Sequence, residues 1–230
     1  MAPRQRAAGA LSTGFPPLDA ALGIGGLPRC RIAELFGPPA SGKTTLALQI
    51  AAHVQRNGRV AAWVDAEHVF DPAYAAALGV SLEALPLGQP ESAEEALGIV
   101  RELALSGAVD LVVVDSAAAL VPRLELEMGL GESGPGLQSR VLGAELRRLA
   151  RTVERSPSAV LFLNQMRSRA GENDSTAGGP SLKLYAAIRI ALEPGGETQS
   201  TFRMLKNKVA EPFAKGVLRR SEGPGFVKSP

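Results

Sequence analysis

The stretch Gly37–Thr44 reads GPPASGKT and fits the pattern G-x-x-x-x-G-K-[ST] of a loop that wraps around phosphate groups. Arg31–Phe36 before it reads as a short strand, and Thr45–Val54 after it reads as an amphipathic helix. In such a strand–loop–helix unit, backbone N–H groups of the loop and of the first helical turn face an anion. The stretch therefore predicts a nucleoside triphosphate site. The alternative is a Gly/Pro turn that carries a lysine by chance.

Individual residues of this loop have separate expected roles. Lys43 reaches the terminal phosphates, and Thr44 places its hydroxyl on Mg²⁺, an ion that prefers oxygen ligands. Pro38 and Pro39 remove two N–H donors and stiffen the entrance to the loop. The residues expected to contact the nucleotide here are Gly37, Pro38, Pro39, Ala40, Ser41, Gly42, Lys43, Thr44 and Thr45.

The composition is that of an ordinary globular protein. The chain has 230 residues, 45% hydrophobic and 21% charged, which suffices for one α/β domain with a sizeable core. A net charge of +2 does not by itself indicate nucleic-acid binding. One cysteine, Cys30, and two histidines argue against a disulfide framework and a Cys/His metal cluster. No run approaches the ~20 apolar residues of a membrane span, so we expect a cytoplasmic protein without membrane association.

Apolar runs and helical patterns alternate along the rest of the chain. A helix is predicted over Ser92–Ser106, with acidic residues in its first turn. Strands separated by helices favour a mostly parallel sheet with helices on both faces. The predicted fold is therefore α/β, with a twisted, mostly parallel central sheet flanked by helices. Strands after the loop are expected at Arg59–Asp65, Val109–Asp115, Ala159–Asn164, Ser181–Leu192 and Thr201–Val209.

A single core domain is predicted over residues 11–230. Residues 1–10 are rich in Ala, Arg and Gly and are expected to form a flexible N-terminal tail. Two Gly-rich polar stretches, Met128–Gly136 and Ser168–Gly179, interrupt the pattern of strands and helices. Loops of this length inside a domain are commonly functional.

Three polar side chains stand at the ends of predicted strands. Asp115 can hold the hydration shell of Mg²⁺, or it can cap the following segment. Glu67 can orient or deprotonate the water that attacks the γ-phosphate, or it can form a surface ion pair. Gln165 ends the third of these strands. Because open α/β sheets bind ligands at the carboxyl ends of their strands, we expect the three side chains to lie near the phosphate loop.

Five separated blocks of the chain resemble, in order, the core of the bacterial RecA recombinase family. The resemblance covers nearly the full length of the chain and implies a RecA-like P-loop fold with Mg²⁺-dependent ATPase activity. Agreement of this kind is more specific for fold and nucleotide site than for biological role. The blocks are Leu11–Leu46, Asp65–Val80 (DAEHVFDPAYAAALGV), Ser106–Pro122, LFLNQMR at Leu161–Arg167 and KNKVAEPF at Lys206–Phe213.

The resemblance implies catalytic roles for several of these residues. Lys43 and Thr44 would hold phosphate and Mg²⁺, and Asp115 would hold the metal shell. Glu67 would activate the attacking water. Gln165 would sense the γ-phosphate and report it to the loop that follows. By this resemblance the catalytic residues are Lys43, Glu67 and Gln165, and the metal ligands are Thr44 and Asp115.

Two further pairs take their roles from the resemblance alone. Asp71 and Tyr74, within DPAY, would contact adenine, whereas Tyr74 by itself also fits a core position. Lys206 and Lys208 would reach the ATP of a neighbouring subunit and supply positive charge to it. Locally, these two lysines also fit solvated positions on an edge strand.

The chain departs from the family in the parts that join subunits and bind DNA. Only residues 1–10 precede the matching region, and the chain ends at Pro230. We therefore expect neither the N-terminal polymerisation arm nor the C-terminal domain of the family, and weak or absent self-association. The second DNA-facing loop, Met166–Ala177, has no bulky apolar residue beyond Met166 to insert between bases. DNA binding is therefore expected to be weak or absent.

Five arginines are candidates for contact with DNA or a protein partner. Three of them are spaced seven and four residues apart within a predicted helix, Leu137–Arg155, and form one basic stripe on it. Such a stripe is either a solvated or protein-contact face, or a track for phosphates. The other two lie in the second loop. The five are Arg140, Arg147, Arg151, Arg167 and Arg169.

These departures favour an accessory ATPase of DNA repair. The group that fits best is the ImuA type, RecA-related proteins encoded with an ImuB-type polymerase homologue and an error-prone polymerase in SOS-induced translesion mutagenesis. We expect slow, DNA-independent ATP hydrolysis, with RecA and ImuB-type or error-prone polymerase components as partners. The alternatives are a minimal DNA-dependent recombinase that forms filaments, a non-catalytic ATP-gated interaction module, and, remotely, a P-loop kinase.

Overall fold

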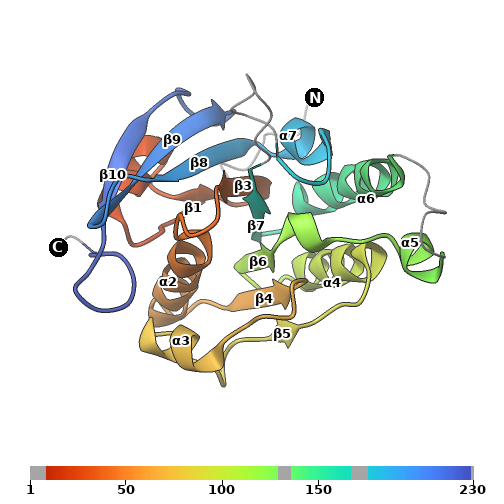
Figure 1. Ribbon diagram of the computed structural model, residues 1–230, viewed down its shortest axis with the longest axis horizontal. Helices are drawn as coiled ribbons and strands as arrows, with labels where there is room; N and C mark the ends of the chain where they lie inside the picture. The colour runs from red at the N-terminus through yellow and green to blue at the C-terminus, as the bar shows by residue number, and fades with distance from the viewer. Residues whose placement is uncertain (1–8, 129–135, 167–175, 229–230) are drawn as a thin grey trace, which may run out of the picture.

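Eight strands form one sheet (Figure 1). In chain order they are β3 (Arg31–Gly37), β4 (Ala61–Asp65), β5 (Leu87–Gly88), β6 (Leu111–Asp115), β7 (Ala159–Gln165), β8 (Ile188–Pro194), β9 (Gln199–Asn207) and β10 (Lys215–Arg219). The computed structural model describes residues 9–128, 136–166 and 176–228. Across the sheet the strands lie in the order β10-β9-β8-β3-β7-β6-β4-β5. The pairs from β8 to β5 are parallel, and β9 and β10 add an antiparallel edge.

Helices cover both faces of this sheet (Figure 1). They are α1 (Pro16–Leu22), α2 (Lys43–Arg56), α3 (Pro72–Ala77), α4 (Ala93–Ser106), α5 (Arg123–Glu127), α6 (Leu137–Val153) and α7 (Ser181–Tyr185), with a 3₁₀ turn η1 (Ala117–Ala119). Buried residues of α1, α2 and α3 join one core, and those of α4, α6 and α7 join the other. The predicted α/β fold with a mostly parallel central sheet is confirmed. None of the helices in the described ranges is long and apolar enough to span a membrane.

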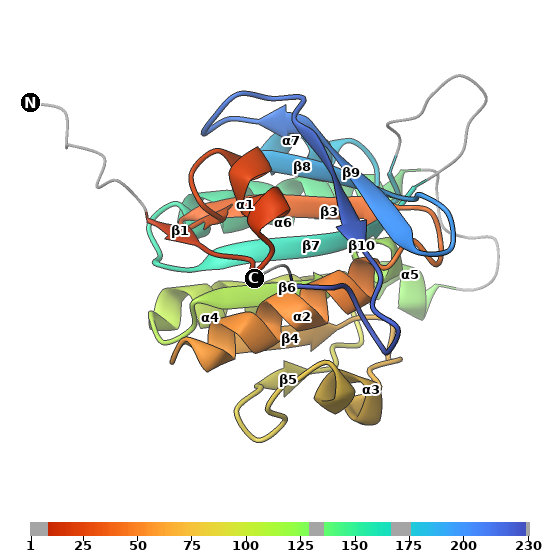
Figure 2. The same cartoon turned by 90° about the vertical axis from the view of Figure 1, so that its left-hand side faces the viewer.

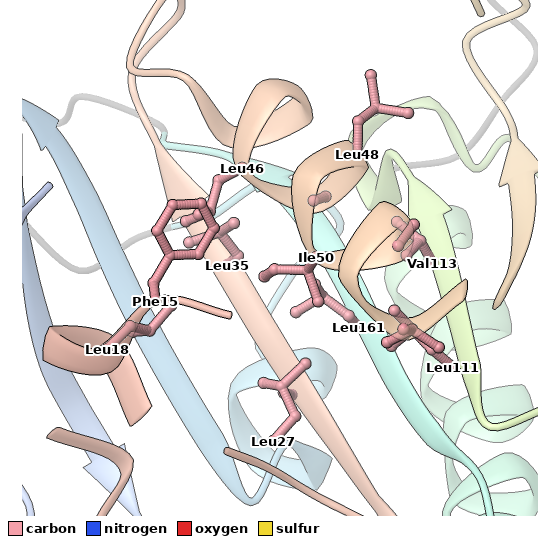
Figure 3. Close-up of a cluster of buried hydrophobic side chains, with 14 of the residues drawn as sticks. Phe15, Leu18, Leu27, Leu35, Leu46, Leu48, Ile50, Leu111, Val113 and Leu161 are labelled. Carbon is pink, nitrogen blue, oxygen red and sulfur yellow. The ribbon is translucent and has the colours of Figure 1, made fainter. Parts of the chain in front are cut away.

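The central strands contribute to both cores because successive side chains point to opposite faces. Leu35 of β3 and Leu161 of β7 belong to the core under α2, together with Ile50 of that helix (Figure 3). Phe162 and Val114 belong to the core under α4 and α6. Since both faces of these strands are covered, their sequences read as continuous apolar runs and not as alternating ones.

The register of the sheet aligns the strand ends that carry polar residues. Gly37 at the end of β3 pairs with Gln165 at the end of β7. Asp65 at the end of β4 pairs with Asp115 at the end of β6. Four strands of the parallel region therefore finish together, and the phosphate-loop sequence begins at the same edge.

Helix α6 agrees with the helix that the sequence predicts over Leu137–Arg155. Its apolar residues are buried against the sheet and α4, whereas the three arginines of the stripe are exposed. The buried residues are Leu142, Leu146, Leu149 and Val153, and the exposed arginines are Arg140, Arg147 and Arg151.

Two local predictions differ from the structure. Ser181–Leu192 does not form one strand, because Ser181–Tyr185 is the helix α7 and β8 starts only at Ile188. Pro180 directly precedes this helix. Leu182 is the only buried residue of the helix, so its side chains do not alternate between buried and exposed as they would in a strand.

The last two residues of the predicted flexible tail, residues 9 and 10, form backbone hydrogen bonds. Ala10 belongs to a two-stranded ribbon in which β1 (Ala10–Leu11) pairs with β2 (Leu27–Pro28), and Gly9 O accepts a hydrogen bond from Arg29 N at 3.2 Å. These backbone bonds fix the chain at residues 9 and 10. Residues 1–8 lie outside the described residues.

Candidate nucleotide-binding site

The phosphate-loop sequence connects the end of β3 to the start of α2, as predicted. At Gly37 a Cβ would lie 2.0 Å from the carbonyl oxygen of Leu192. At Gly42, which precedes α2 with a φ of +95°, a Cβ would lie 2.6 Å from the ring of Phe226. A side chain would clash at both positions, so the two glycines allow the close approach of the loop to its surroundings.

Lys43 lies across this loop. Its Nζ donates to the carbonyl oxygens of Pro38 at 2.8 Å and Gly37 at 3.1 Å. Burial lowers the pKa of Lys43, while the carboxylates of Asp115 and Glu67 act in the opposite direction. A partly buried ammonium group above a loop at a helix N-terminus suits the terminal phosphates of a nucleotide.

Thr44 and Asp115 are brought together from the start of α2 and the end of β6. Thr44 Oγ1 donates to Asp115 Oδ2 at 3.0 Å. Burial raises the pKa of Asp115 to about 6; the nearby carboxylates of Glu67 and Asp65 add to the rise, and the Thr44 hydrogen bond and Lys43 oppose it. A buried carboxylate of this kind gains most from a nearby cation.

The chemistry of these two side chains fits Mg²⁺. A hydroxyl and a carboxylate offer the oxygen ligands that this ion prefers. Within the described parts of the chain, no group of three or more His, Cys, Asp or Glu side chains could hold a metal by itself. The ion would therefore take its other ligands from phosphate oxygens and water, which is its usual mode in nucleotide sites.

Glu67 and Gln165 also meet at this edge of the sheet, as predicted. Gln165 Nε2 lies 3.4 Å from Glu67 Oε1. The same oxygen accepts a hydrogen bond from Ser116 Oγ. Ser116 is not among the residues predicted from the sequence, although this serine directly follows Asp115 in VVVDS. A carboxylate with an amide and a hydroxyl beside it can accept a proton from a water molecule.

Asp65 fixes the loop that carries Glu67. This carboxylate is 1% exposed and accepts hydrogen bonds from Phe70 N at 3.0 Å, Val69 N at 3.3 Å and Gln89 Nε2 at 2.9 Å. This role of Asp65 was not predicted from the sequence either. Asp65 is the first residue of a block that resembles the family, but its hydrogen-bond partners are evident only once the chain is folded.

Asp71 and Tyr74 lie beside the start of α2. Asp71 Oδ1 caps α3 by accepting a hydrogen bond from Tyr74 N at 3.0 Å. The Tyr74 hydroxyl lies 2.8 Å from Thr45 Oγ1. Tyr74 thus links α3 to the phosphate loop, and it lines a cavity of about 280 Å³ together with Gly42, Thr45 and Arg220. This position suits the base and sugar of a nucleotide whose phosphates lie in the loop.

Residues 220–228, which we call the C-terminal strap, complete the wall of this cavity. The strap leaves β10 and folds back beside α2 (Figure 2). The Gln49 side chain pairs with Phe226 through both of the latter's backbone groups, at 2.9 Å and 2.7 Å. Arg220 donates to the carbonyl oxygen of Ala40 at 3.3 Å. The strap is rich in Gly and Pro and shows no periodic pattern that sequence analysis could have used.

The two lysines of KNK lie at the end of β9. Lys206 Nζ donates to the carbonyl oxygens of Lys183 at 2.7 Å and Leu184 at 3.0 Å. Burial lowers the pKa of Lys206 to about 8, and the positive charges of Lys208 and Arg189 add to this. Among the residues described, neither Lys206 nor Lys208 contacts the phosphate loop of its own chain. Their role at a neighbouring subunit stays a prediction.

The candidate arginines fall into two groups. Arg140, Arg147 and Arg151 are exposed along α6. Arg147 Nε donates to the hydroxyl of Tyr185 at 3.1 Å, and this hydrogen bond raises the pKa of Arg147. Arg167 and Arg169 lie outside the described residues, as does most of Met128–Gly136 and of the second DNA-facing loop.

A phosphate loop between a parallel strand and a helix, with polar side chains at the ends of the adjacent strands, defines the chain as an α/β protein with a RecA-like P-loop fold. The family model described as RecA N-terminal domain matches residues 3–225. The chain belongs to the RecA family.

Relatives named Protein RecA match most of this chain. The one from Rubrobacter xylanophilus is 50% identical over 231 residues, which is 95% of this chain and 67% of that protein. The one from Chlorobium limicola is 49% identical over 229 residues, 94% of this chain and 65% of the relative. The one from Chlorobaculum tepidum is 49% identical over 216 residues, 88% of this chain and 62% of the relative. The chain thus spans about two thirds of the length of these relatives.

Proposed function

We propose that this protein binds ATP with Mg²⁺ and hydrolyses it, in the cytoplasm, as part of DNA repair and recombination. The observation that carries the proposal is the meeting of Lys43, Thr44, Asp115, Glu67 and Gln165 at one edge of the sheet. The similarity to proteins named RecA supports it. The residues act together, because phosphate binding, metal binding and water activation need different groups around one triphosphate.

Each group has a defined task in this proposal. Mg²⁺ held there would supply positive charge against the charge that develops on the phosphate oxygens. Thr44 and Asp115 would hold the ion. Lys43 and the backbone N–H groups of the loop bind and orient the phosphates. Glu67 accepts a proton from the attacking water, and Gln165, whose Nε2 lies 3.4 Å from Glu67 Oε1, senses the γ-phosphate.

Substitution of Lys43 tests the site directly. We expect Lys43→Ala to weaken ATP binding by at least about tenfold and to abolish turnover, since the phosphates lose their main cationic partner. Equilibrium titration with ATP and a phosphate-release assay measure the two effects. Lys215→Ala, at an exposed position on β10, is the matched control and should leave both unchanged. Wild-type ATP affinity in the Lys43→Ala variant would contradict the proposal.

For the biological role we propose an accessory ATPase of the ImuA type. The support is the sequence of Met166–Ala177, which offers no aromatic residue for separating bases and carries two acidic residues, Glu172 and Asp174. The second candidate is a DNA-dependent recombinase, favoured by relatives that are 48–50% identical and named Protein RecA. A third, an ATP-gated interaction module, predicts binding without turnover.

One assay distinguishes these candidates. ATP turnover is measured with and without single-stranded DNA at low salt, where phosphate contacts are strongest. Turnover that DNA does not change supports the accessory role. Strong stimulation by DNA overturns it in favour of the recombinase, and ATP binding without turnover favours the module.

The proposed partners are RecA and ImuB-type or error-prone polymerase components. One surface suited to docking carries Lys206 and Lys208 of KNK, which, within the described residues, make no contact with the phosphate loop of their own chain. The other is the edge of the sheet with the phosphate loop, where a bound triphosphate would offer the complementary negative charge. We propose that the protein docks on the end of a RecA filament through one of these two faces.

A further inference from the structure

The hydroxyl of Ser116 has an unusual partner for its position. Ser116 is 2% exposed and precedes η1 as its N-cap residue. A serine at such a position usually accepts a hydrogen bond from an N–H group of the first turn. Here the side chain makes no capping bond, and it donates instead to Glu67 Oε1. A buried hydroxyl that donates to a carboxylate favours one orientation of that carboxylate.

The backbone around Glu67 is already fixed by other contacts. Ala66 N and Glu67 N donate to the carbonyl oxygen of Asp115, at 2.7 Å and 3.3 Å. The carboxylate of Asp65 accepts hydrogen bonds from the backbone N–H groups of Val69 and Phe70, which follow Glu67 in the chain. The torsions of the Glu67 side chain are therefore the remaining freedom of this group, and they are what Ser116 restricts.

The two oxygens of the Glu67 carboxylate are not equivalent. Oε1 accepts the hydrogen bond from Ser116 and lies 3.4 Å from Gln165 Nε2. Within the described residues, Oε2 accepts no hydrogen bond from another residue. These contacts thus leave Oε2 as the more accessible oxygen for accepting a proton from water.

We infer that Ser116 is a positioning residue for ATP hydrolysis, which holds Glu67 Oε1 so that Oε2 meets the attacking water. The inference rests on the proposed ATPase activity of this site. In the step concerned, the water oxygen bonds to the γ-phosphorus and the bond from that phosphorus to the ADP oxygen breaks. ADP keeps the electron pair, and the water proton passes to Glu67 Oε2. Ser116 keeps its own proton throughout.

The test compares turnover with binding in variants of Ser116. We expect Ser116→Ala to lower kcat by about tenfold, which corresponds to about 1.4 kcal/mol and agrees with the loss of a hydrogen bond to a charged group. The dissociation constant for ATP should change by less than about twofold, because the Ser116 side chain makes no hydrogen bond to the phosphate loop among residues 9–128, 136–166 and 176–228. Ser116→Thr restores the hydroxyl and most of kcat.

Ser158→Ala is the matched control. Ser158 is also fully buried, and its hydroxyl donates to the carbonyl oxygen of Val109 at 2.6 Å. Ser158 directly precedes β7 and therefore lies at the end of this strand away from Gln165 and the nucleotide site. Its loss should lower thermal stability without changing kcat. If Ser116→Ala does not fold, Ser116→Cys, of similar size but a weaker donor, should show the same selective loss of kcat.

A double-mutant cycle with Glu67→Asp shows whether Ser116 acts through Glu67. The shorter carboxylate cannot keep the same contact, so Ser116→Ala should lower kcat by less than about twofold in that background. Three results would each overturn this inference and leave the proposed ATPase activity standing. They are an equal loss of kcat in both backgrounds, a kcat of Ser116→Ala equal to wild type, and a loss of ATP affinity that matches the loss of kcat. Wild-type protein that binds ATP but does not hydrolyse it would overturn the proposed ATPase activity, and the inference with it.

Discussion

Asp115 combines burial with a functional need for charge. It is 8% exposed, and its pKa of about 6 lies above the ordinary value of 3.8. A carboxyl group with a raised pKa binds its proton more tightly in the folded state than in the unfolded state. The penalty for holding the charged form is therefore fully present above pH 6, decreases as the pH falls, and is gone below pH 3.8.

Asp115→Asn should stabilise the nucleotide-free protein at pH 7.5. The pKa shift sets the gain at about 1–3 kcal/mol, because each unit corresponds to about 1.4 kcal/mol. The gain should vanish near pH 4, where the wild-type carboxyl is already neutral. Thermal or urea unfolding across this range measures it. Asp71→Asn is the control, since asparagine caps a helix as well as aspartate does; a gain in Asp115→Asn that does not depend on pH would contradict the explanation.

Among single residues, the sequence predicts those whose roles follow from a contiguous motif. Lys43 and Thr44 are recognisable because the phosphate loop is contiguous and its spacing is specific. Ser116 and Asp65 escaped prediction because their roles come from contacts across strands: Ser116 reaches Glu67, 49 residues away, and Asp65 reaches Gln89, 24 residues away. A serine or an aspartate in isolation carries no comparable pattern.

Among the elements, the C-terminal strap lies against the phosphate loop and the start of α2. Phe226 is 4% exposed and packs edge-on against Phe15, with ring centroids 6.5 Å apart. It also lies against Gly42 at the start of α2. Phe226 therefore anchors the strap to the core beneath the site.

Phe226→Ala should destabilise the protein by about 3–5 kcal/mol, the usual cost of truncating a buried phenylalanine. Urea unfolding provides the measurement. Its neighbour Val227 is 45% exposed, so Val227→Ala should cost less than about 0.5 kcal/mol and serves as the control. Similar unfolding curves for the two variants would show that the strap does not pack as described.

Element prediction succeeded where burial is two-sided. The central strands β4, β6 and β7 read as continuous apolar runs because helices cover both faces. The sequence did not predict β5 or β10. β5 has two residues, and β10 is an edge strand with one buried residue, Leu218, so neither carries a clear apolar pattern. α7 was expected as a strand because a helix of five residues shows too little of the helical period.

At the scale of the whole molecule, the position of KNK bears on how the protein contacts a partner. Lys206 is held by the carbonyl groups at the end of α7, and that helix follows the second predicted DNA-facing loop in the chain. This arrangement presents KNK on a surface separate from the phosphate loop of its own chain. It supports docking to the nucleotide of a neighbour, in keeping with the proposed function.

Lys206→Ala/Lys208→Ala should weaken binding to RecA by at least about tenfold, because two cations that face an anionic nucleotide are lost. ATP binding by the variant itself should stay unchanged. Titration of labelled protein into RecA with a non-hydrolysable ATP analogue measures the first effect, and Lys215→Ala is again the control. Unchanged affinity of the double variant for RecA would refute this docking mode.

At the whole-molecule scale, family membership was predictable and biological role was not. The five blocks that resemble the RecA family lie in the core and at the site, and the match to the RecA N-terminal domain over residues 3–225 confirms them. The proposed accessory role and the alternative recombinase role would both use this core. The choice between them depends on contacts with DNA and with protein partners, which the sequence of a single chain does not encode as a local pattern.

The pairing of Gln49 with Phe226 joins residues 177 positions apart. During translation, at about 5–20 residues per second, Gln49 would wait roughly 10–35 s for the residue that satisfies its amide. The helix that begins at Lys43 therefore leaves the ribosome well before the segment that completes its packing. A growing chain would therefore hold this surface of the helix exposed until residue 226 has emerged from the ribosome.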